Sequence, residues 1–208
     1  SLLYYLGGIN FGVALYVNKK NVRIFYLQKK CKKIYYIDVR NYKKLKKLFH
    51  KIKPHCCIHF AAQPLVIESY NQSRKTFEIN SFGTINILEI LKELNIPSIL
   101  ITSDKTYKPS KKIYHSEESA LGGEDPYSAS KSMADIAINS YLKSFGLKVA
   151  SCRAGNIIGG GDWQKDRLVP DIIRSVFEKK KLFIRYLNAK RPWQHVLDVN
   201  LNYLKILK

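Results

Sequence analysis

A tyrosine and a lysine that stand four residues apart, Tyr127 and Lys131, form the first candidate group for chemistry in this sequence. If the segment is helical, both side chains lie on one face of the helix. A lysine ammonium beside a phenol lowers the pKa of the phenol, so the tyrosine can act as a base near neutral pH. Because the chain contains 14 tyrosines and many lysines, the spacing alone is a weak signal, and its context decides.

That context is an earlier polar segment. Ser103, Asp104 and Lys105 directly follow the apolar residues 98–102. Such an apolar segment is typical of a buried strand. A serine hydroxyl at the end of this strand is placed to share the proton of a substrate oxygen with Tyr127. The two segments together therefore indicate proton removal from a hydroxyl group.

The surrounding pattern alternates short apolar segments with helical periods. We predict strands at 9–16, 34–37, 56–60, 98–102 and 147–152, and helices at 41–51, 76–94 and 127–145. Strands that alternate with helices predict parallel β-α-β units in a doubly wound α/β sheet. Ligands bind such sheets beyond the carboxyl ends of the strands. The residues to inspect are therefore those that follow the strands, namely Asp38, 61–63, 103–105 and 153–156. Beyond about Gly160 the pattern loosens, and a smaller region is expected to begin.

Composition excludes several classes of protein. The net charge is +20, but the positive residues are mostly lysines scattered in short runs, which favours a solvated basic surface over a nucleic-acid site. The four cysteines form no zinc-ligand spacing, so no metal site is predicted, and a reduced cytoplasmic setting fits them. Residues 2–17 are apolar but interrupted by glycines and too short to span a bilayer. The sequence thus predicts neither a nucleic-acid nor a membrane partner.

Five sequence blocks, in order along the chain, resemble those of the CDP-glucose 4,6-dehydratases, a branch of the extended short-chain dehydrogenase/reductase superfamily. They are His-Phe-Ala-Ala-Gln-Pro-Leu-Val at 59–66, Thr-Ser-Asp-Lys at 102–105, Asp-Pro-Tyr-Ser at 125–128, Arg-Ala-Gly-Asn-Ile-Ile-Gly-Gly-Gly-Asp-Trp at 153–163 and Arg-Pro-Trp-Gln-His-Val at 191–196. Asp38 and Asn80 match the extended branch as well. Most related dehydratases have Asp-Glu where this chain has Asp104 and Lys105, and the lysine is typical of the CDP-glucose branch.

The resemblance implies a cofactor, a substrate and a set of site residues. The cofactor is NAD, and the substrate is CDP-glucose or a similar nucleotide sugar. The implied catalytic residues are Ser103, Asp104, Lys105, Tyr127 and Lys131. The implied NAD-binding residues are Asp38, Val39, Ala61, Ala62, Gln63 and Asn80, with Tyr127 and Lys131. The implied substrate-binding residues are Asn156, Arg167, Leu168 and Arg191.

The implied reaction has no net change of oxidation state. Tyr127, helped by Ser103 and Lys131, removes the proton of the C4 hydroxyl while a hydride passes from C4 to NAD. Asp104 then protonates the departing C6 hydroxyl and Lys105 acts as the base at C5, before the hydride returns to C6. The product would be a 4-keto-6-deoxy sugar nucleotide, as used in lipopolysaccharide O-antigen biosynthesis. The resemblance also implies a homo-oligomer for the full-length protein.

The chain departs from the family pattern at its start. The family opens with a strand and a Gly-x-x-Gly-x-x-Gly turn, whereas residues 1–6 look like the helix after that turn, and Gly7 and Gly8 come too late to replace it. Residues 16–18, Tyr-Val-Asn, stand where an acidic residue for the adenosine ribose is expected. We therefore expect residues 1–158 to form a Rossmann-like NAD-binding domain without its first strand and glycine-rich loop. Residues 159–208 would be part of a substrate-binding region, and both ends of the chain look cut.

Two other interpretations stay open at this stage. One is an epimerase or dehydratase that acts on a different nucleotide sugar, against which Lys105 and the block at 191–196 argue. The other is a non-catalytic remnant of the family, which the missing glycine-rich turn favours. Single residues also have plainer explanations, because Asp38 could cap the following helix and Arg167 and Arg191 could be solvated surface cations.

We expect the 208 residues to bind NAD weakly, because the pyrophosphate would lack the amide donors and the helix dipole of a glycine-rich turn. Isothermal titration calorimetry of the chain with NAD measures this directly. Binding with a micromolar or lower dissociation constant would contradict the expectation.

Overall fold

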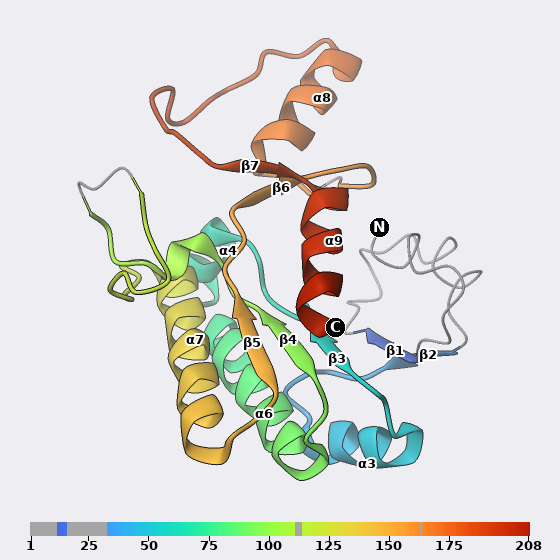
Figure 1. Ribbon diagram of the computed structural model, residues 1–208. Coiled ribbons are helices and arrows are strands. Elements are labelled where there is room, and N and C mark those ends of the chain that lie inside the picture. The colour runs from blue at the N-terminus through green and yellow to red at the C-terminus, as the bar shows by residue number, and fades with distance from the viewer. Residues whose placement is uncertain (1–11, 16–32, 111–113, 163) are drawn as a thin grey trace.

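The computed structural model describes residues 12–15, 33–110, 114–162 and 164–208 (Figure 1). The strands are β1 (Gly12–Leu15), β2 (Lys33–Tyr36), β3 (Cys57–His59), β4 (Ser98–Ile101), β5 (Val149–Cys152), β6 (Asn156–Ile158) and β7 (Trp193–His195). The α-helices are α3 (Tyr42–Ile52), α4 (Val66–Asn71), α5 (Ser73–Phe77), α6 (Gly83–Leu94), α7 (Pro126–Phe145), α8 (Leu168–Glu178) and α9 (Val196–Leu207). The predictions for residues 1–8 and 16–18 lie outside the described residues.

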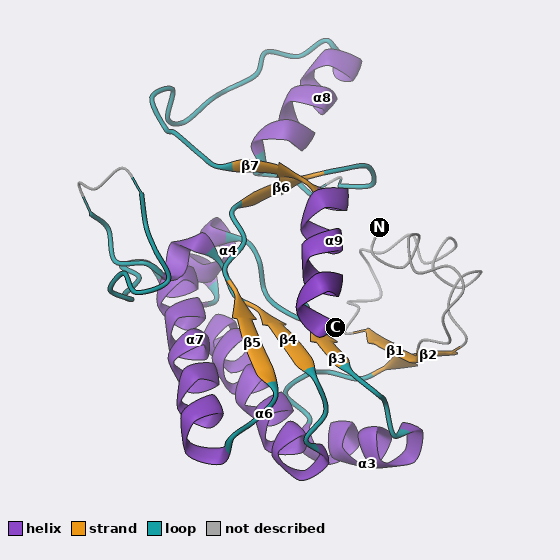
Figure 2. Ribbon diagram, viewed as in Figure 1, coloured by secondary structure: helices purple, strands orange, loops and turns teal. Residues whose placement is uncertain are grey.

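All the strand pairs in the described part of the chain are parallel, as predicted. The central ladder runs β3-β4-β5, and β1 pairs with β2 and β6 with β7 in separate ladders (Figure 2). Since parallel strands present their carboxyl ends at one edge, the residues that follow β3, β4 and β5 emerge together. This edge is where the candidate side chains were expected.

Helices cover both faces of the central ladder, which confirms the doubly wound arrangement. Ile99 and Leu100 are neighbours in β4 and both are fully buried, on opposite faces of the sheet. Leu100 belongs to the larger apolar cluster, which includes residues of α3, α6 and α7. Ile99 belongs to a second cluster with Val199 and Tyr203 of α9 (Figure 1). Helix α9 packs on the sheet, although it belongs to residues 159–208, which were expected to form a separate substrate-binding region. The division of the chain into residues 1–158 and 159–208 stays a prediction.

Helices α3 and α7 form where local signals indicate them. The side chain of Asn41 accepts a hydrogen bond from the Lys44 amide and caps α3, whose buried side includes Leu45 and Leu48. Asp125 caps α7 in the same way, through the Ser128 amide. A capping side chain satisfies an amide that the helix itself leaves unpaired. Because Asn41 is the cap of α3, the plainer explanation of Asp38 as that cap is wrong.

The helix predicted at 76–94 begins earlier and is not uniform. It starts as α5 and passes through a π-helical turn, η1 (Glu78–Phe82), before it continues as α6. A side chain in place of Gly83 would clash with Val39, since a Cβ there would lie 2.7 Å from Val39 Cγ1. A π-turn adds a residue to the helical turn and so redirects the side chains around it. Here it places Asn80 and Ser81 together on the side that faces α7.

Three helices of the structure were not predicted from the sequence. Helix α4 is short and follows the loop after β3, and α8 and α9 lie in the segment where the pattern loosened. Among the described residues, no helix combines the length and the apolar character needed to cross a membrane.

Replacing Leu88 with alanine is expected to lower the free energy of unfolding by about 2–5 kcal/mol, because a fully buried leucine would leave a cavity. Urea unfolding followed by circular dichroism measures the loss. The matched control is Leu142→Ala on α7, where the leucine is 40% exposed and the expected loss is below about 1 kcal/mol. Equal losses in the two variants would show that α6 does not form the centre of the core.

Candidate active site

Four of the predicted catalytic side chains meet at the carboxyl end of β4. Ser103 lies beside the phenol of Tyr127 and acts to lower the pKa of that phenol. Its hydroxyl also lies 3.0 Å from Asp104 Oδ1, to which it donates, and 3.2 Å from the Lys105 amide, from which it accepts. Lys105 Nζ lies 6.0 Å from the centre of the Tyr127 ring. The short 3₁₀ turn η2 (Asp104–Thr106) thus presents two ionisable groups beside the phenol.

Lys131 lies one helical turn after Tyr127, as the spacing predicts. Its Nζ donates a 2.9 Å hydrogen bond to the carbonyl oxygen of Ile101, the last residue of β4. The side chain is buried, and burial lowers the pKa of Lys131 to about 8. A lysine with this pKa exchanges its proton near physiological pH, which suits a group that supports proton transfer.

The expectation that the lysine ammonium lowers the pKa of Tyr127 is wrong for this structure. Burial raises the pKa of Tyr127 above its ordinary value, and the nearby Ser103 hydroxyl offsets only part of that effect. The ammonium of Lys131 is directed to the Ile101 carbonyl. The phenol is therefore held protonated at neutral pH.

Two buried serines anchor the start of α7. The hydroxyl of Ser69 in α4 accepts a 3.1 Å hydrogen bond from the Tyr127 amide, and the Ser130 hydroxyl donates to the Tyr127 carbonyl at 2.7 Å. Ser69 and Ser130 are completely buried. Neither serine was predicted from the sequence, because a single serine within a helix shows no pattern that distinguishes it from other polar residues.

Asn80 joins the loop after β3 to α7. Its Oδ1 accepts from the Gln63 amide at 2.8 Å, and its Nδ2 donates to the Gln63 carbonyl at 3.1 Å and to Ser130 Oγ at 2.9 Å. All of its amide groups are thus satisfied within a buried setting, where unpaired groups are costly. Ala61 and Ala62 belong to the same loop and are partly buried. The predicted cofactor residues of this loop are therefore held in fixed relation to Tyr127.

Asp38 and Val39 lie at the end of β2, away from the catalytic group. Asp38 forms an ion pair with Arg40, in which Nη2 and Oδ2 are 2.6 Å apart, and Arg40 also contacts Glu78 at 3.2 Å. The hydrogen bond from Arg40 lowers the pKa of Asp38. Val39 is buried against Gly83. The Asp38 carboxylate is therefore ionised and held at the strand end by its neighbour.

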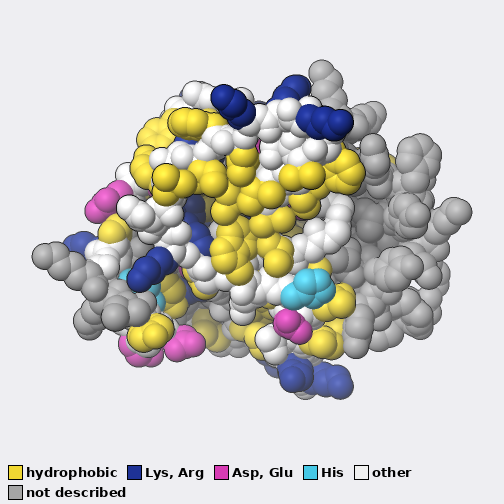
Figure 3. All heavy atoms as spheres, turned by 90° about the horizontal axis from the view of Figure 1, so that it is seen from above, with side chains coloured by type: hydrophobic (Ala, Val, Ile, Leu, Met, Phe, Trp, Pro, Cys, Tyr) yellow, Lys and Arg dark blue, Asp and Glu magenta, His cyan; other side chains and the backbone are white. Residues whose placement is uncertain are grey.

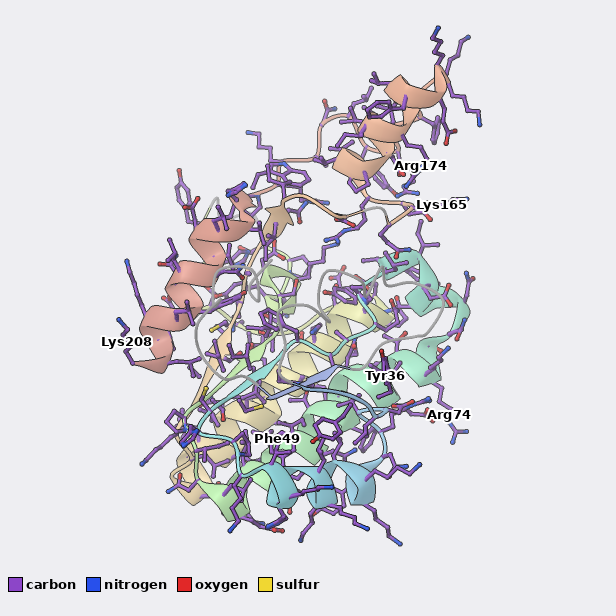
Figure 4. All side chains as sticks on the ribbon, turned by 90° about the vertical axis from the view of Figure 1, so that its right-hand side faces the viewer. Tyr36, Phe49, Arg74, Lys165, Arg174 and Lys208 are labelled. Atoms are coloured by element: carbon purple, nitrogen blue, oxygen red, sulfur yellow. The ribbon has the colours of Figure 1, made fainter. Side chains whose placement is uncertain are left out.

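Three of the four predicted substrate residues share one cavity. Asn156, Leu168 and Arg191 line a space of about 520 Å³ together with residues of α8 and the segment 180–193. Figure 4 shows Arg174 of the same cavity on α8, at the end of the molecule away from Phe49 of α3. Arg167 is not among the lining residues; it pairs with Asp162 at 2.9 Å and acts on Tyr127 through its charge.

Hydrophobic side chains gather on the face of the molecule that is seen from above in Figure 3. Separately, the most exposed hydrophobic residues in the segment from α8 to β7 are Val176, Phe177, Phe183, Tyr186 and Leu187. In the described part of the chain, no three His, Cys, Asp or Glu residues come together as metal ligands would.

Comparison with known proteins places these features in a family. A family model described as GDP-mannose 4,6 dehydratase matches residues 13–208. CDP-glucose 4,6-dehydratase of Salmonella typhimurium is 41% identical over 181 residues, which cover 81% of this chain and 50% of that protein. The dTDP-D-glucose 4,6-dehydratase of Dictyostelium discoideum is 32% identical over 73% of this chain and 38% of its own length. The chain thus spans half or less of the length of these two relatives.

Solved structures share the fold. The dTDP-glucose 4,6-dehydratase of Bacillus anthracis, in complex with NAD, matches with a TM-score of 0.77 and 25% identity over 91% of this chain and 59% of that chain. The UDP-glucose 4-epimerase of Thermotoga maritima, with UDP-glucose, matches with a TM-score of 0.87 over 98% of this chain and 67% of that chain. Because the identity to the epimerase is 19%, that likeness shows the fold alone.

We predict that one lysine of the folded chain titrates near pH 8 and that this signal belongs to Lys131. The unfolded chain keeps this proton up to about pH 10.4. The free energy of unfolding should therefore rise with pH between about 8 and 10.4, because the unfolded state binds the extra proton there. Carbon-13 spectra of labelled lysines across this pH range test the assignment, and the signal should vanish in Lys131→Met. A spectrum in which that signal persists in the variant contradicts it.

Proposed function

Because the chain belongs to the GDP-mannose 4,6 dehydratase family, we propose that its site dehydrates a nucleotide sugar with the help of NAD, and that the sugar nucleotide is CDP-glucose. The observation that carries the proposal is the meeting of Ser103, Tyr127 and Lys105 at the end of β4. In this arrangement Ser103 and Tyr127 can together activate a hydroxyl group. Lys105, beside them, can accept a second proton.

The described residues fit NAD at the carboxyl edge of the sheet. The ionised Asp38 carboxylate, still partly exposed at the end of β2, is suited to accept a hydrogen bond from adenosine. The loop 61–63, fixed by Asn80, and the Lys131 side chain would hold the other end. When bound, NAD would accept a hydride from C4 of the sugar and return it to C6. The protein supplies position and proton transfer.

Proton transfer at C4 falls to Tyr127 and Ser103. The Ser103 hydroxyl beside the phenol would share the proton that the phenol receives from the C4 hydroxyl. The positive charge of Arg167 also favours the ionised phenol. Burial opposes ionisation, so the phenolate is a stronger base once it forms. The pair is therefore suited to remove a proton from a weakly acidic alcohol.

Elimination falls to the two groups on the η2 turn. A ketone at C4 makes the C5 proton acidic, and Lys105, in its neutral form, would remove it. Asp104, which accepts a hydrogen bond from Ser103, would give a proton to the departing C6 hydroxyl. The step balances, because the C6 hydroxyl leaves as water with the proton from Asp104, the C5 proton stays on Lys105, and a double bond forms between C5 and C6.

The 520 Å³ cavity is proposed to hold the nucleotide diphosphate. Its volume lies in the range of about 300–1,000 Å³ that is usual for small-molecule sites. Arg191 at its wall offers a planar guanidinium that matches paired phosphate oxygens. Assembly as a homo-oligomer, a cytoplasmic location and a role in lipopolysaccharide O-antigen synthesis are proposed with the function, as is the division at residue 159.

A non-catalytic role is the second candidate, because the 208 residues contain no Gly-x-x-Gly-x-x-Gly motif. The complete gene product that carries these residues decides between the two. Incubation with NAD and CDP-glucose, UDP-glucose or dTDP-glucose, followed by mass spectrometry, should show loss of water from CDP-glucose at the highest rate. The absence of dehydration with all three substrates would favour the non-catalytic role.

Replacing Lys105 with methionine should spare oxidation at C4 and slow the elimination, because Tyr127, Ser103 and Lys131 serve the first step without it. A general base typically supplies about 10²- to 10⁴-fold in rate, so dehydration should fall by a factor in this range. The variant should accumulate the 4-keto-glucose nucleotide, and exchange of the C5 proton with deuterated solvent should fall in step.

The matched control is Lys108→Met, since Lys108 is exposed three residues further along the same loop. This control should turn over normally. If Lys105→Met also turned over normally, or failed already at oxidation of C4, the assigned role would be wrong, and Lys105 would be better understood as a cation that orients the substrate.

A further inference from the structure

A buried carboxylate continues the row of functional side chains along α7. Tyr127, Lys131 and Asp135 follow one another at intervals of four residues, so they share one face of the helix. Each contacts the end of β4 or the residues directly after it. Tyr127 lies beside Ser103, Lys131 donates to the Ile101 carbonyl, and Asp135 accepts from the Thr102 hydroxyl at 2.8 Å. The family resemblance gave no role to Asp135.

Asp135 is surrounded by donors. It is only 1% exposed, and Oδ2 accepts hydrogen bonds from the hydroxyls of Thr102 and Ser151, both at 2.8 Å. Arg153 binds both carboxylate oxygens, with Nε 2.9 Å from Oδ2 and Nη2 2.7 Å from Oδ1. Burial acts to raise the pKa of Asp135, but the hydrogen bonds from these three residues outweigh it and lower the pKa. The carboxylate is therefore charged and fully paired.

Arg153 connects this carboxylate to the segment that leads into α7. It follows β5 directly, and its Nη1 donates to the Glu117 carbonyl at 3.0 Å and to the Tyr107 hydroxyl at 3.3 Å. Its guanidinium also lies 5.1 Å from the centre of the Tyr107 ring, which stacks on His115. One side chain thus contacts α7 and both sides of the loop between η2 and α7.

Stability alone does not account for a buried ion pair. Taking two charges out of water costs several kcal/mol each, and apolar residues of similar volume often stabilise a fold equally well. What an ion pair with two parallel hydrogen bonds adds is direction, because the planar guanidinium fixes the orientation of its partner. The pair is placed where orientation matters, since Thr102 directly precedes Ser103.

We propose that Asp135 and Arg153 are positioning residues whose ion pair holds the end of β4, and with it Ser103, against the face of α7 that carries Tyr127 and Lys131. The proposal rests on the proposed function, because it assigns the pair a part in that reaction. Misplacement of a reacting group by about 1 Å can cost about a hundredfold in rate. Loss of the pair should therefore lower kcat and leave substrate binding in the 520 Å³ cavity unchanged, because neither residue lines it.

The first experiment needs no substrate. The amides of Thr102 and Asp104 bond to the carbonyls of Cys152 and Ala154 beside the ion pair, whereas the Ser98 amide bonds to the Lys148 carbonyl at the far end of β4. In Arg153→Met, hydrogen-exchange protection at Thr102 and Asp104 should fall at least about tenfold, with Ser98 unchanged, because only the near end loosens. Equal loss at all three amides, or no loss at any, would overturn the proposal.

The second experiment measures turnover of CDP-glucose by the complete gene product. The double variant Asp135→Asn/Arg153→Met removes both charges together and so avoids an unpaired buried charge. Its kcat should fall about 10- to 100-fold while KM changes less than about twofold. Arg153→Lys, which keeps the charge but not the paired geometry, should recover only part of the rate.

Glu89→Gln is the matched control, because Glu89 accepts a hydrogen bond from Tyr141 and so joins α6 to α7 away from the site. It should lose stability but keep its kcat. A folded double variant with the kcat of the parent protein would overturn the positioning role. If the parent protein does not turn over CDP-glucose, the proposed function fails, and the exchange experiment alone decides whether the pair holds Ser103.

Discussion

The register between α7 and the end of β4 is the constraint on which the rest of the site depends. Four residues of an α-helix advance about 6 Å, and two residues of a strand advance about 6.6 Å. The step from Tyr127 to Lys131 therefore matches the step from Ser103 back to Ile101, and both contacts form at once. Insertion of one residue between Tyr127 and Lys131 would remove this match.

The opposite side of α7 has a separate set of contacts. Ser81 in the π-turn donates to the Ser130 carbonyl at 2.9 Å, and Asn80 contacts the Ser130 side chain and the loop after β3. The turn that disturbs the helix thereby brings two successive side chains to one neighbour. The loop after β3 and Tyr127 consequently share one support, although Gln63 and Tyr127 are 64 residues apart in the sequence.

Much of this arrangement could be predicted from the sequence. The features that could not be predicted depend on long-range contacts and on burial, which local sequence patterns do not show. Helical periods located α3 and α7, and the strand-end rule predicted that Ser103 lies beside Tyr127. The π-turn and α4 were not predicted, because they depend on contacts with residues that are distant in the sequence, such as Val39 and Tyr127. The pKa of Tyr127 was misjudged because burial, which spacing does not reveal, exceeds the effect of a nearby charge.

The start of α7 has a consequence for how charge is distributed across the site. Its first free amides are already used, that of Tyr127 by Ser69 and that of Ser128 by the Asp125 carboxylate, whose negative charge also offsets the helix dipole. This helix end therefore offers little attraction to an anion. A ligand with a diphosphate would find its countercharge at side chains such as Arg191 of the 520 Å³ cavity rather than at this helix end.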